Sequence, residues 1–435
     1  MNKSQLALFG GAPLVHQSWP ETNTIGEEEK KSVLQVLDSG VLSGFRATAG
    51  DDFVGGPMVR QLEKDWAAFY GMKYAISFNS LTSGLFAAVG AVGVGPGDEV
   101  IVSPFTMSAS ATCAIPYGAV PVFADIDPNT YCLDPKSIAE RITPRTKAIV
   151  IVHIFGYPAD MDAIMEIAAQ YNLMVIEDCA QAPAGKHKGN FVGSFGHIGG
   201  FSLNYHKTIH SGEGGVMVTN DDDLALRLRL IRNHGEVIVD DLEVKRIANT
   251  FGGNTRMTEL EAAVAMEQLK KLDFLTDWRI RLAGYLDEKM AAFSGITPQK
   301  LVHTHDKHVY YFYVMRYDAE VTGIPRDAFV KAVCAEGIDL HQGYVRPIYW
   351  EPIYQQKIAY SKNQYPFESE FYDAVIEYPK GLCPVVERVH ADEIIHGKFC
   401  RWPLSEAHLD QVVAVFEKVL AHSNELVASG VDHQI

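Results

Sequence analysis

Between residues 55 and 235 the chain alternates short apolar runs with helical patterns, and this alternation constrains the fold more than any other feature. The runs are apolar on both faces, as strands in the middle of a parallel sheet are. Strands of this kind separated by helices predict an α/β domain with a mostly parallel sheet covered on both sides. The expected strands are 74–78, 99–102, 120–123, 148–154 and 173–176, and the expected helices are 59–69, 82–92, 108–115 and 161–171.

A second, smaller domain is expected after a long helical pattern that begins at Thr258. We place the boundary so that residues 1–274 form the large domain and 275–435 the small one, although the N-terminal segment could pack with the small domain. A strand at 308–316 and helices at 326–336 and 406–422 indicate an α+β fold there. Residues 345–395 are rich in tyrosine, proline and charge and follow neither period, so we interpret them as a long loop insertion.

The bulk properties exclude several classes of protein. The formal net charge of −16 argues against nucleic acid as a partner, because phosphate backbones are bound by clustered basic residues. No apolar run approaches the length of roughly 20 residues that a membrane helix needs, so no membrane association is expected. The six cysteines form no CxxC pair, which favours reduced thiols and a cytoplasmic protein.

Polar residues that come directly after the predicted strands are candidates for a binding site, because ligands of such sheets bind outside the carboxyl ends of the strands. Leu81 and Thr82 stand where a strand gives way to a helix, whose unpaired N–H groups suit a phosphate. Asp178 follows another strand and could pair with the protonated nitrogen of a pyridine cofactor. Taken singly, each is better explained as part of a helix cap.

Lys207 is the one lysine in a stretch, 200–215, that is otherwise rich in glycine and aromatic residues. A desolvated lysine has a lowered pKa, and its neutral amine can form an imine near neutral pH. A solvated surface lysine is nevertheless the ordinary explanation of any single lysine. The stretch 252–257, before the long helix, indicates by itself only a turn and a helix start.

The order and spacing of these residues are much more specific than any one of them. Asp178, Ser202 and Lys207 in that order, followed by Gly212-Glu213-Gly214-Gly215, resemble the DegT/DnrJ/StrS family of sugar aminotransferases. The resemblance extends from about residue 56 to residue 272, and more loosely through 308–316. It implies the type I fold of aspartate aminotransferase, pyridoxal 5'-phosphate (PLP) as cofactor, and a homodimer with shared active sites.

The resemblance also implies a role for individual residues. Lys207 would carry PLP as a Schiff base and move the proton, and Asp178 would hold the pyridinium nitrogen. The other expected cofactor contacts are Gln181 beside the ring hydroxyl, Leu81, Thr82 and Ser202 at the phosphate, and Asn254 from the neighbouring subunit.

One position departs from the family pattern. Family members commonly stack an aromatic ring on the cofactor at the position where this chain has Met107. A thioether can also pack on a π-face, and Phe105 is the alternative source of a ring.

For the reaction, the resemblance implies L-glutamate as amino donor and an aldehyde or keto sugar as acceptor. The stretches 42–45 and 106–110 are most similar to enzymes that act on keto-inositols or on an oxidised octulosonate of lipopolysaccharide. We expect 8-oxo-3-deoxy-D-manno-octulosonate, which would give 8-amino-3,8-dideoxy-D-manno-octulosonate. The alternatives are scyllo-inosose and a nucleotide-linked keto-hexose, and a PLP-binding sensor without activity is an alternative of another class. A basic residue such as Arg256 or Arg346 facing the pocket would favour the carboxylated sugar.

Two other patterns are set aside. His206 and His210, and the group His303, His305 and His308, have spacings found in metal sites, but both fall in predicted loops, so no metal is expected. The glycine-rich run 90–95 ends a helical pattern instead of following a strand, which argues against a dinucleotide-binding loop.

Overall fold

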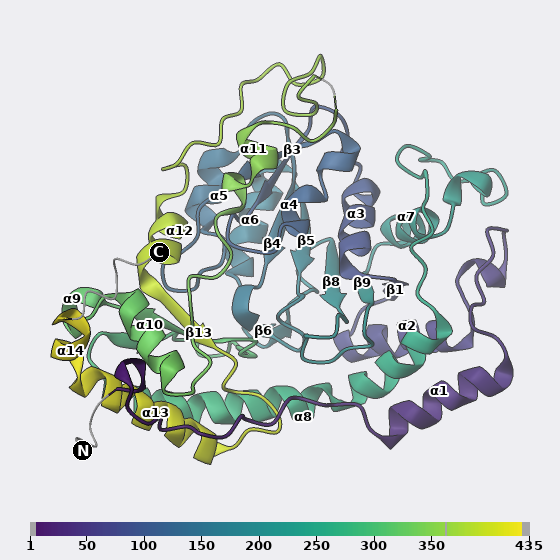
Figure 1. Cartoon of the computed structure of the whole chain (residues 1–435). Helices are drawn as coiled ribbons and strands as arrows, with labels where there is room; N and C mark the ends of the chain where they lie inside the picture. The colour runs from purple at the N-terminus through teal and green to yellow at the C-terminus, as the bar shows by residue number, and fades with distance from the viewer. Residues whose placement is uncertain (1–5, 362, 429–435) are drawn as a thin grey trace.

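The computed structural model describes residues 6–361 and 363–428, so 1–5 and 429–435 of the predicted domains and residue 362 of the predicted insertion lie outside it. A seven-stranded sheet forms its centre (Figure 1). The strands are β1 (Tyr74–Phe78), β2 (Glu99–Val102), β3 (Val120–Phe123), β4 (Thr146–Val152), β5 (Met174–Asp178), β8 (Ile198–Ser202) and β9 (Gly215–Thr219). Their order across the sheet is β1-β9-β8-β5-β4-β2-β3.

Most neighbours in this sheet are parallel. The five strands from β8 to β3 run in the same direction, and β9 alone pairs antiparallel on both of its sides, with β1 and β8. The predicted mostly parallel sheet is therefore confirmed. The sequence analysis did not predict β8 or β9: glycines interrupt β8, and β9 is a short run that begins with Gly215. In β8 a Cβ atom on Gly199 would lie 2.1 Å from the carbonyl oxygen of Gly193, so the backbone packing there requires glycine.

Helices cover both faces of the sheet. They are α1 (Glu27–Ser39), α2 (Pro57–Tyr70), α3 (Leu81–Ala91), α4 (Ala109–Thr112), α5 (Pro135–Arg141), α6 (Met161–Tyr171), α7 (Asp222–Arg232) and α8 (Glu259–Met290). One apolar core contains side chains from α3, α5 and α6, and a second contains side chains from α2 and the first half of α8. Each face of the sheet thus has its own hydrophobic layer, as the apolar strands require.

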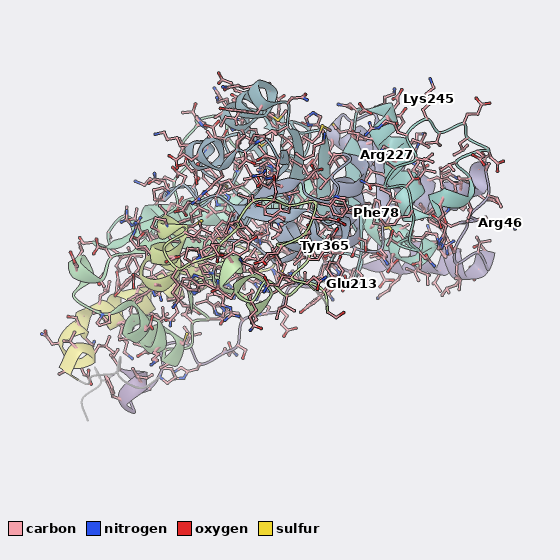
Figure 2. The ribbon with its side chains drawn as sticks, turned by 90° about the horizontal axis from the view of Figure 1, so that it is seen from above. Arg46, Phe78, Glu213, Arg227, Lys245 and Tyr365 are labelled. Carbon is pink, nitrogen blue, oxygen red and sulfur yellow. The ribbon has the colours of Figure 1, made fainter. Side chains whose placement is uncertain are left out.

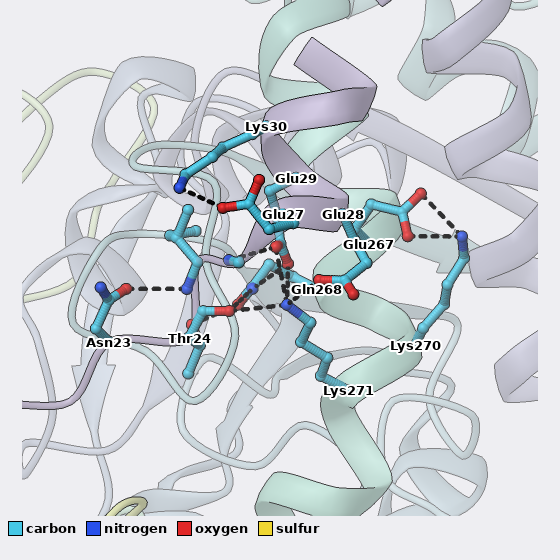
Figure 3. A network of polar contacts seen from close by, with 12 residues as sticks. Asn23, Thr24, Glu27, Glu28, Glu29, Lys30, Glu267, Gln268, Lys270 and Lys271 are labelled. Atoms are coloured by element: carbon cyan, nitrogen blue, oxygen red, sulfur yellow. Dashed lines mark hydrogen bonds and ion pairs between the residues drawn. The ribbon is translucent and has the colours of Figure 1, made fainter. Parts of the chain in front are cut away.

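Helix α1 was not predicted, and a buried polar network fixes it to α8 (Figure 3). Glu29 of α1 is 1% exposed and accepts hydrogen bonds from Lys271 and Gln268 of α8, at 2.6 and 2.7 Å. Gln268 also donates to the carbonyl of Thr24 and accepts from the backbone N–H of His210, at 2.9 and 3.4 Å. The network therefore connects α1 and α8 to the loop that follows Lys207.

The C-terminal part contains a four-stranded antiparallel sheet in the order β10-β11-β13-β12. Its elements are β10 (Ile296–Pro298), β11 (Tyr313–Tyr317), α9 (Ala319–Thr322), α10 (Arg326–Ala335), β12 (His341–Gln342), α11 (Pro352–Gln355), α12 (Pro384–Arg388), β13 (Ile394–Gly397), α13 (Glu406–Ala421) and α14 (Ser423–Ala428). The second half of α8, from Leu282 to Met290, packs in this core, and so do Leu6 and Val15 of the N-terminal segment. The long helix α8 thus runs beneath both parts of the chain (Figure 1).

The predicted strand 308–316 is shorter in the structure and begins at Tyr313. The residues before it form backbone hydrogen bonds with the loop that follows β4. The N–H of Val309 donates to the carbonyl of Gly156 and that of Tyr311 to the carbonyl of Phe155, at 3.0 and 2.8 Å. The predicted insertion, 345–395, is mostly irregular and packs back onto the large sheet. In the view from above in Figure 2, Tyr365 lies over the large-sheet part of the molecule, away from the C-terminal helices.

The insertion covers the edge strand β3 and its neighbour β2. Tyr378 donates to the carbonyl of Pro121, and Tyr372 to the carboxylate of Glu99, at 2.7 and 3.0 Å. Covered edges do not offer unpaired backbone groups to other chains. Within residues 6–361 and 363–428, no helix combines the length and apolarity that crossing a membrane requires.

Candidate active site

A cavity of about 400 Å³ lies at the carboxyl ends of β5 and β8, where the fold places ligands. The structure brings together here all but one of the residues predicted from the sequence. The cavity is lined by Leu81, Thr82, Met107, Asp178, Gln181, Ser202 and Lys207. The exception, Asn254, is exposed and does not line it.

Lys207 lies in the loop between β8 and β9, and its Nζ atom is 5.0 Å from the centre of the Tyr311 ring. No described residue accepts a hydrogen bond from this amine. Burial lowers the pKa of Lys207 to about 8, although the carboxylate of Asp178 acts in the opposite direction, and the charge of Lys398 adds to the lowering. A larger fraction of the amine is therefore neutral near neutral pH than in a solvated lysine.

Asp178 is the last residue of β5 and is 5% exposed. Its Oδ2 accepts a hydrogen bond from the hydroxyl of Ser110, and its Oδ1 accepts one from the N–H of Ala180, at 2.8 and 3.0 Å. These two donors fix the carboxylate but leave it further capacity to accept, because each oxygen has two lone pairs. A protonated ring nitrogen in the cavity would supply the missing donor.

The start of α3 forms the third part of the site. Ser80 caps this helix by accepting from the N–H of Ser83, and no described residue accepts from the N–H groups of Leu81 and Thr82. A Cβ atom on Gly215 would lie 2.4 Å from the nitrogen of Leu81, so β9 approaches the helix start as closely as a backbone can. Exposed amides at a helix N-terminus are suited to binding a phosphate.

Residues from the C-terminal part close the cavity. Tyr311, Phe312, Tyr344 and Lys398 all line it. The amide of Gln181 donates to the hydroxyl of Tyr344 and accepts from the N–H of Phe155, at 2.8 and 2.7 Å, which fixes its orientation while a second N–H and a second lone pair remain for a ligand.

The two candidates for the stacking residue are in different positions. Met107 lines the cavity and is 63% exposed, whereas Phe105 is fully buried and packs edge-on against Phe155 and Tyr344. Of these two residues, only Met107 can contact a ligand in the cavity. The basic residues Arg256 and Arg346 do not line it either, since Arg256 contacts Asn254 and Arg346 forms a two-fold ion pair with Glu351.

The sequence analysis missed several residues of this site, among them Ser110, Tyr311, Tyr344 and Lys398. The local sequence around each of them is typical of an ordinary helix, strand or loop and gives no sign of a binding role. Ser110 is a small residue in a small-residue helix, and Lys398 follows a strand in another domain. Only their positions in the fold identify them.

The residues present fit a phosphorylated pyridine aldehyde. One cavity is lined by an amine that donates to no described residue, a fixed carboxylate and a helix N-terminus. These are the groups that an aldehyde carbon, a ring nitrogen and a phosphate require. Together with the fold, this site defines a PLP-dependent aminotransferase of type I.

Comparisons with known proteins identify the family. Residues 23–397 match the model of the DegT/DnrJ/EryC1/StrS aminotransferase family. The L-glutamine:scyllo-inosose aminotransferase of Streptomyces griseus is 33% identical over 97% of this chain and 99% of its own. The GDP-perosamine synthase of Caulobacter vibrioides is 37% identical over 74% of this chain and 84% of its own. The crystal structure of an aminotransferase from Psychrobacter cryohalolentis superposes with a TM-score of 0.78 at 29% identity, covering 94% and 99% of the two chains.

The chain therefore belongs to the DegT/DnrJ/EryC1/StrS aminotransferase family, whose members are PLP-dependent, and it is a sugar aminotransferase.

Proposed function

We propose that this enzyme transfers an amino group from L-glutamate to the aldehyde of 8-oxo-3-deoxy-D-manno-octulosonate, which gives 8-amino-3,8-dideoxy-D-manno-octulosonate. The observation that carries this choice is Lys398, a cation that lines the cavity and forms no ion pair with the residues that the structure describes. A sugar acid can supply the anion, and a neutral cyclitol cannot.

In this proposal the chain's own residues perform four tasks. PLP, when bound, supplies the electron sink that stabilises a carbanion at the reacting carbon. Asp178 would keep a proton on the ring nitrogen, and the amine of Lys207 would remove a proton from the donor's α-carbon and deliver it to the former aldehyde carbon of the cofactor. The amides of Leu81 and Thr82, with Ser202, hold the phosphate. Tyr344 and its neighbours exclude water.

The surroundings of Lys398 support an anionic substrate. Its Nζ atom lies 5.3 Å from the centre of the Phe312 ring and 5.9 Å from that of Tyr311. Partial burial lowers the pKa of this lysine, and the charges of Arg401 and Arg279 lower it further. No described carboxylate forms an ion pair with it. Asp339 acts on this pKa in the opposite direction, and Asp178 and Glu213 also line the cavity, so the positive charge is local to Lys398, where a substrate carboxylate could pair with it.

Lys398 could contact the carboxylate of the sugar or that of the amino donor, and the two half-reactions separate these roles. With glutamate the cofactor's absorbance changes as the amino group is taken up, and with the sugar the original absorbance returns. We expect Lys398→Gln to raise the KM for the octulosonate by about tenfold or more, the value of a lost charged hydrogen bond, and to leave the glutamate half-reaction nearly unchanged.

Arg346→Gln is the matched control, because Arg346 is also a nearby cation but is already paired with Glu351. It should leave both half-reactions unchanged. Equal effects of Lys398→Gln on both half-reactions, or none on the octulosonate, would remove the argument for this acceptor.

scyllo-Inosose is the second candidate, and the coverage of the Streptomyces griseus relative supports it. A panel of octulosonate, scyllo-inosose and a nucleotide-linked keto-hexose, offered after amination with glutamate or glutamine, decides between them. If inosose restores the original absorbance and the octulosonate does not, our proposal is wrong.

We also propose that two copies of the chain share their sites, with Asn254 of one reaching the phosphate held by the other. Large apolar side chains near this residue and near the cavity mouth support the proposal: Phe251 and Ile247 are each 60% exposed, and Tyr205 is 70% exposed. Light scattering should give the mass of a dimer. Asn254→Ala should weaken PLP binding without changing that mass, and a monomeric wild type would refute the arrangement.

A further inference from the structure

We infer that a second site, formed by His187, His303 and Asp306 outside the PLP cavity, binds one divalent transition-metal ion, with Zn²⁺ as the representative. One ligand atom from each of these residues lies within 4.8 Å of the others. Two imidazoles and a carboxylate are ligands that Zn²⁺ prefers, and three protein ligands leave a fourth position for water.

The side chains at the centre of this cluster are buried and have unsatisfied polar atoms. The side chain of His187 is 0% exposed and that of Asp306 is 1% exposed. Neither ring nitrogen of His187 has a hydrogen-bond partner among the described residues, and Oδ2 of Asp306 has none either. A buried imidazole whose nitrogens make no hydrogen bond is destabilising, and a metal ion bound to one nitrogen would satisfy it.

The spacing of these atoms suits a shared metal ion. Nδ1 of His187 lies 3.2 Å from Oδ1 of Asp306, yet the two do not form a hydrogen bond. Two ligands of a tetrahedral zinc ion, at the usual bond length of about 2.0–2.1 Å, are separated by roughly 3.3 Å. The ring of His303 lies at right angles to that of His187, with 5.4 Å between the ring centres.

Carboxylates on the other side of His187 support the same geometry. Its Nε2 faces Asp162 and Asp160, at 3.7 and 3.9 Å. Metal-bound histidines commonly direct their second nitrogen toward a carboxylate, which selects the tautomer and orients the ring. Both carboxylates are partly exposed, and Asp162 also pairs with Lys188, so Asp160 is the one with charge left to attract a cation.

The backbone holds these ligands in place before any metal binds. His187 belongs to a short hairpin of β6 (Lys186–His187) and β7 (Asn190–Phe191). This hairpin pairs with the loop that carries the other ligands: Lys186 and Lys307 exchange two backbone hydrogen bonds, and the N–H of Lys188 donates to Asp306. Binding therefore requires little rearrangement. The sequence-based expectation of no metal considered His303 only with its neighbours in the chain, and the fold supplies the distant partner, His187.

A second cluster with metal-ligand chemistry, His153, Glu177 and Cys179, lacks these features. Nδ1 of His153 accepts from the N–H of Ala159, and its Nε2 contacts Glu177 at 3.0 Å. Glu177 accepts three backbone hydrogen bonds in addition. Because these lone pairs are already used, this cluster is structural. The two clusters have similar residue types, and the His187 site differs from this one in having unpaired polar atoms.

The test is a measurement of zinc bound per chain. The PLP-loaded protein is treated with a chelator, dialysed, incubated with Zn²⁺, separated from free metal and analysed by mass spectrometry of the element. Cys334 is changed to serine in every sample, because it is the exposed one of the six cysteines, all of which the structure describes. We expect one zinc per chain and a higher melting temperature with zinc than without it.

His187→Asn and His303→Asn should each weaken zinc binding at least tenfold and abolish the rise in melting temperature. His305→Asn is the matched control, because His305 is a histidine of the same loop that is exposed and outside the cluster. It should bind zinc as the parent does. His303 is only partly buried, so its variant should fold even if His187→Asn does not. Less than half an equivalent of zinc in the parent, or equal binding by the His303 and His305 variants, would overturn the inference.

Discussion

Replacing Lys207 by methionine should make the cofactor-free protein more stable at neutral pH, although it removes the amine on which the proposed chemistry depends. Burial lowers the pKa of this lysine from its ordinary value of 10.5 to about 8, and the attraction of Asp178 offsets only part of this effect. The difference corresponds to about 3 kcal/mol of free energy by which the charged amine destabilises the folded state. Methionine has a similar length and no charge to desolvate.

The gain should depend on pH in a defined direction. Below pH 8 the lysine is protonated in the folded and the unfolded chain, so the full difference is present. Between about pH 8 and 10.5 the unfolded chain retains a proton that the folded chain has lost, and the stability of the wild type therefore rises with pH. The difference in the free energy of unfolding between Lys207→Met and the wild type should therefore shrink across this window. Above it the difference should stay constant, because the lysine is then neutral in both states.

Urea unfolding of both cofactor-free proteins measures this difference in the free energy of unfolding. We expect Lys207→Met to exceed the wild type by about 3 kcal/mol near pH 7 and by less than half of that near pH 9.5. Lys64→Met, which changes an exposed lysine of α2, is the control and should have a small effect that is the same at both pH values. A Lys207→Met protein that is less stable at neutral pH, or whose advantage does not change with pH, would refute the reasoning.

Three further changes test other parts of the structure. Ser110→Ala removes the hydroxyl that donates to Asp178 and should slow the glutamate half-reaction about tenfold in stopped-flow absorbance, and an unchanged rate would exclude a role for this bond. Gly215→Ala places a methyl group against the nitrogen of Leu81 and should weaken PLP binding at least tenfold in equilibrium dialysis, whereas Gly95→Ala, which has open space, should not. Glu63→Gln leaves the buried guanidinium of Arg232 without its carboxylate and should lower the free energy of unfolding by about 3–5 kcal/mol in urea, and a loss below 1 kcal/mol would contradict the ion pair's importance.

Local sequence patterns were sufficient for the elements that bury apolar side chains. The strands β1, β2 and β3 and the helix α6 have the predicted bounds. Each of them buries apolar side chains whose run or helical spacing can be recognised from its own residues. The elements that were not predicted depend on contacts made elsewhere. Helix α1 begins with three glutamates, and its buried Glu29 is stabilised by Lys271, more than 200 residues further along the chain. No local period can indicate such a partner.

For the candidate site too, local patterns predicted some residues but not how the fold brings them together. Asp178 could be predicted because it ends a strand of the large sheet, where ligands bind, and Lys207 because it is the one lysine of a glycine-rich stretch whose spacing from Asp178 and Ser202 resembles the family. Their joint location in one cavity depends on the strand order, in which β8 lies beside β5. The order was not deducible from the apolar pattern, since glycines obscured β8. Met107 was predicted as a contact from the family resemblance, and the structure places it in the cavity.

The residues that the C-terminal part contributes to the cavity are held in place by a different sheet from the one that holds the reactive groups. Tyr344 and Lys398 stand just outside the two ends of the long insertion, and the strands next to them are paired: His341 lies opposite His396 and Gln342 opposite Ile395. This pairing of β12 with β13 fixes the position of both residues whatever the length or course of the chain between them. The reactive groups, in contrast, are fixed by the large sheet. Substitutions at Tyr344 or Lys398 would therefore alter this wall of the cavity while Asp178 and Lys207 keep their positions, so under the proposed function the acceptor could change without any change in the reactive groups.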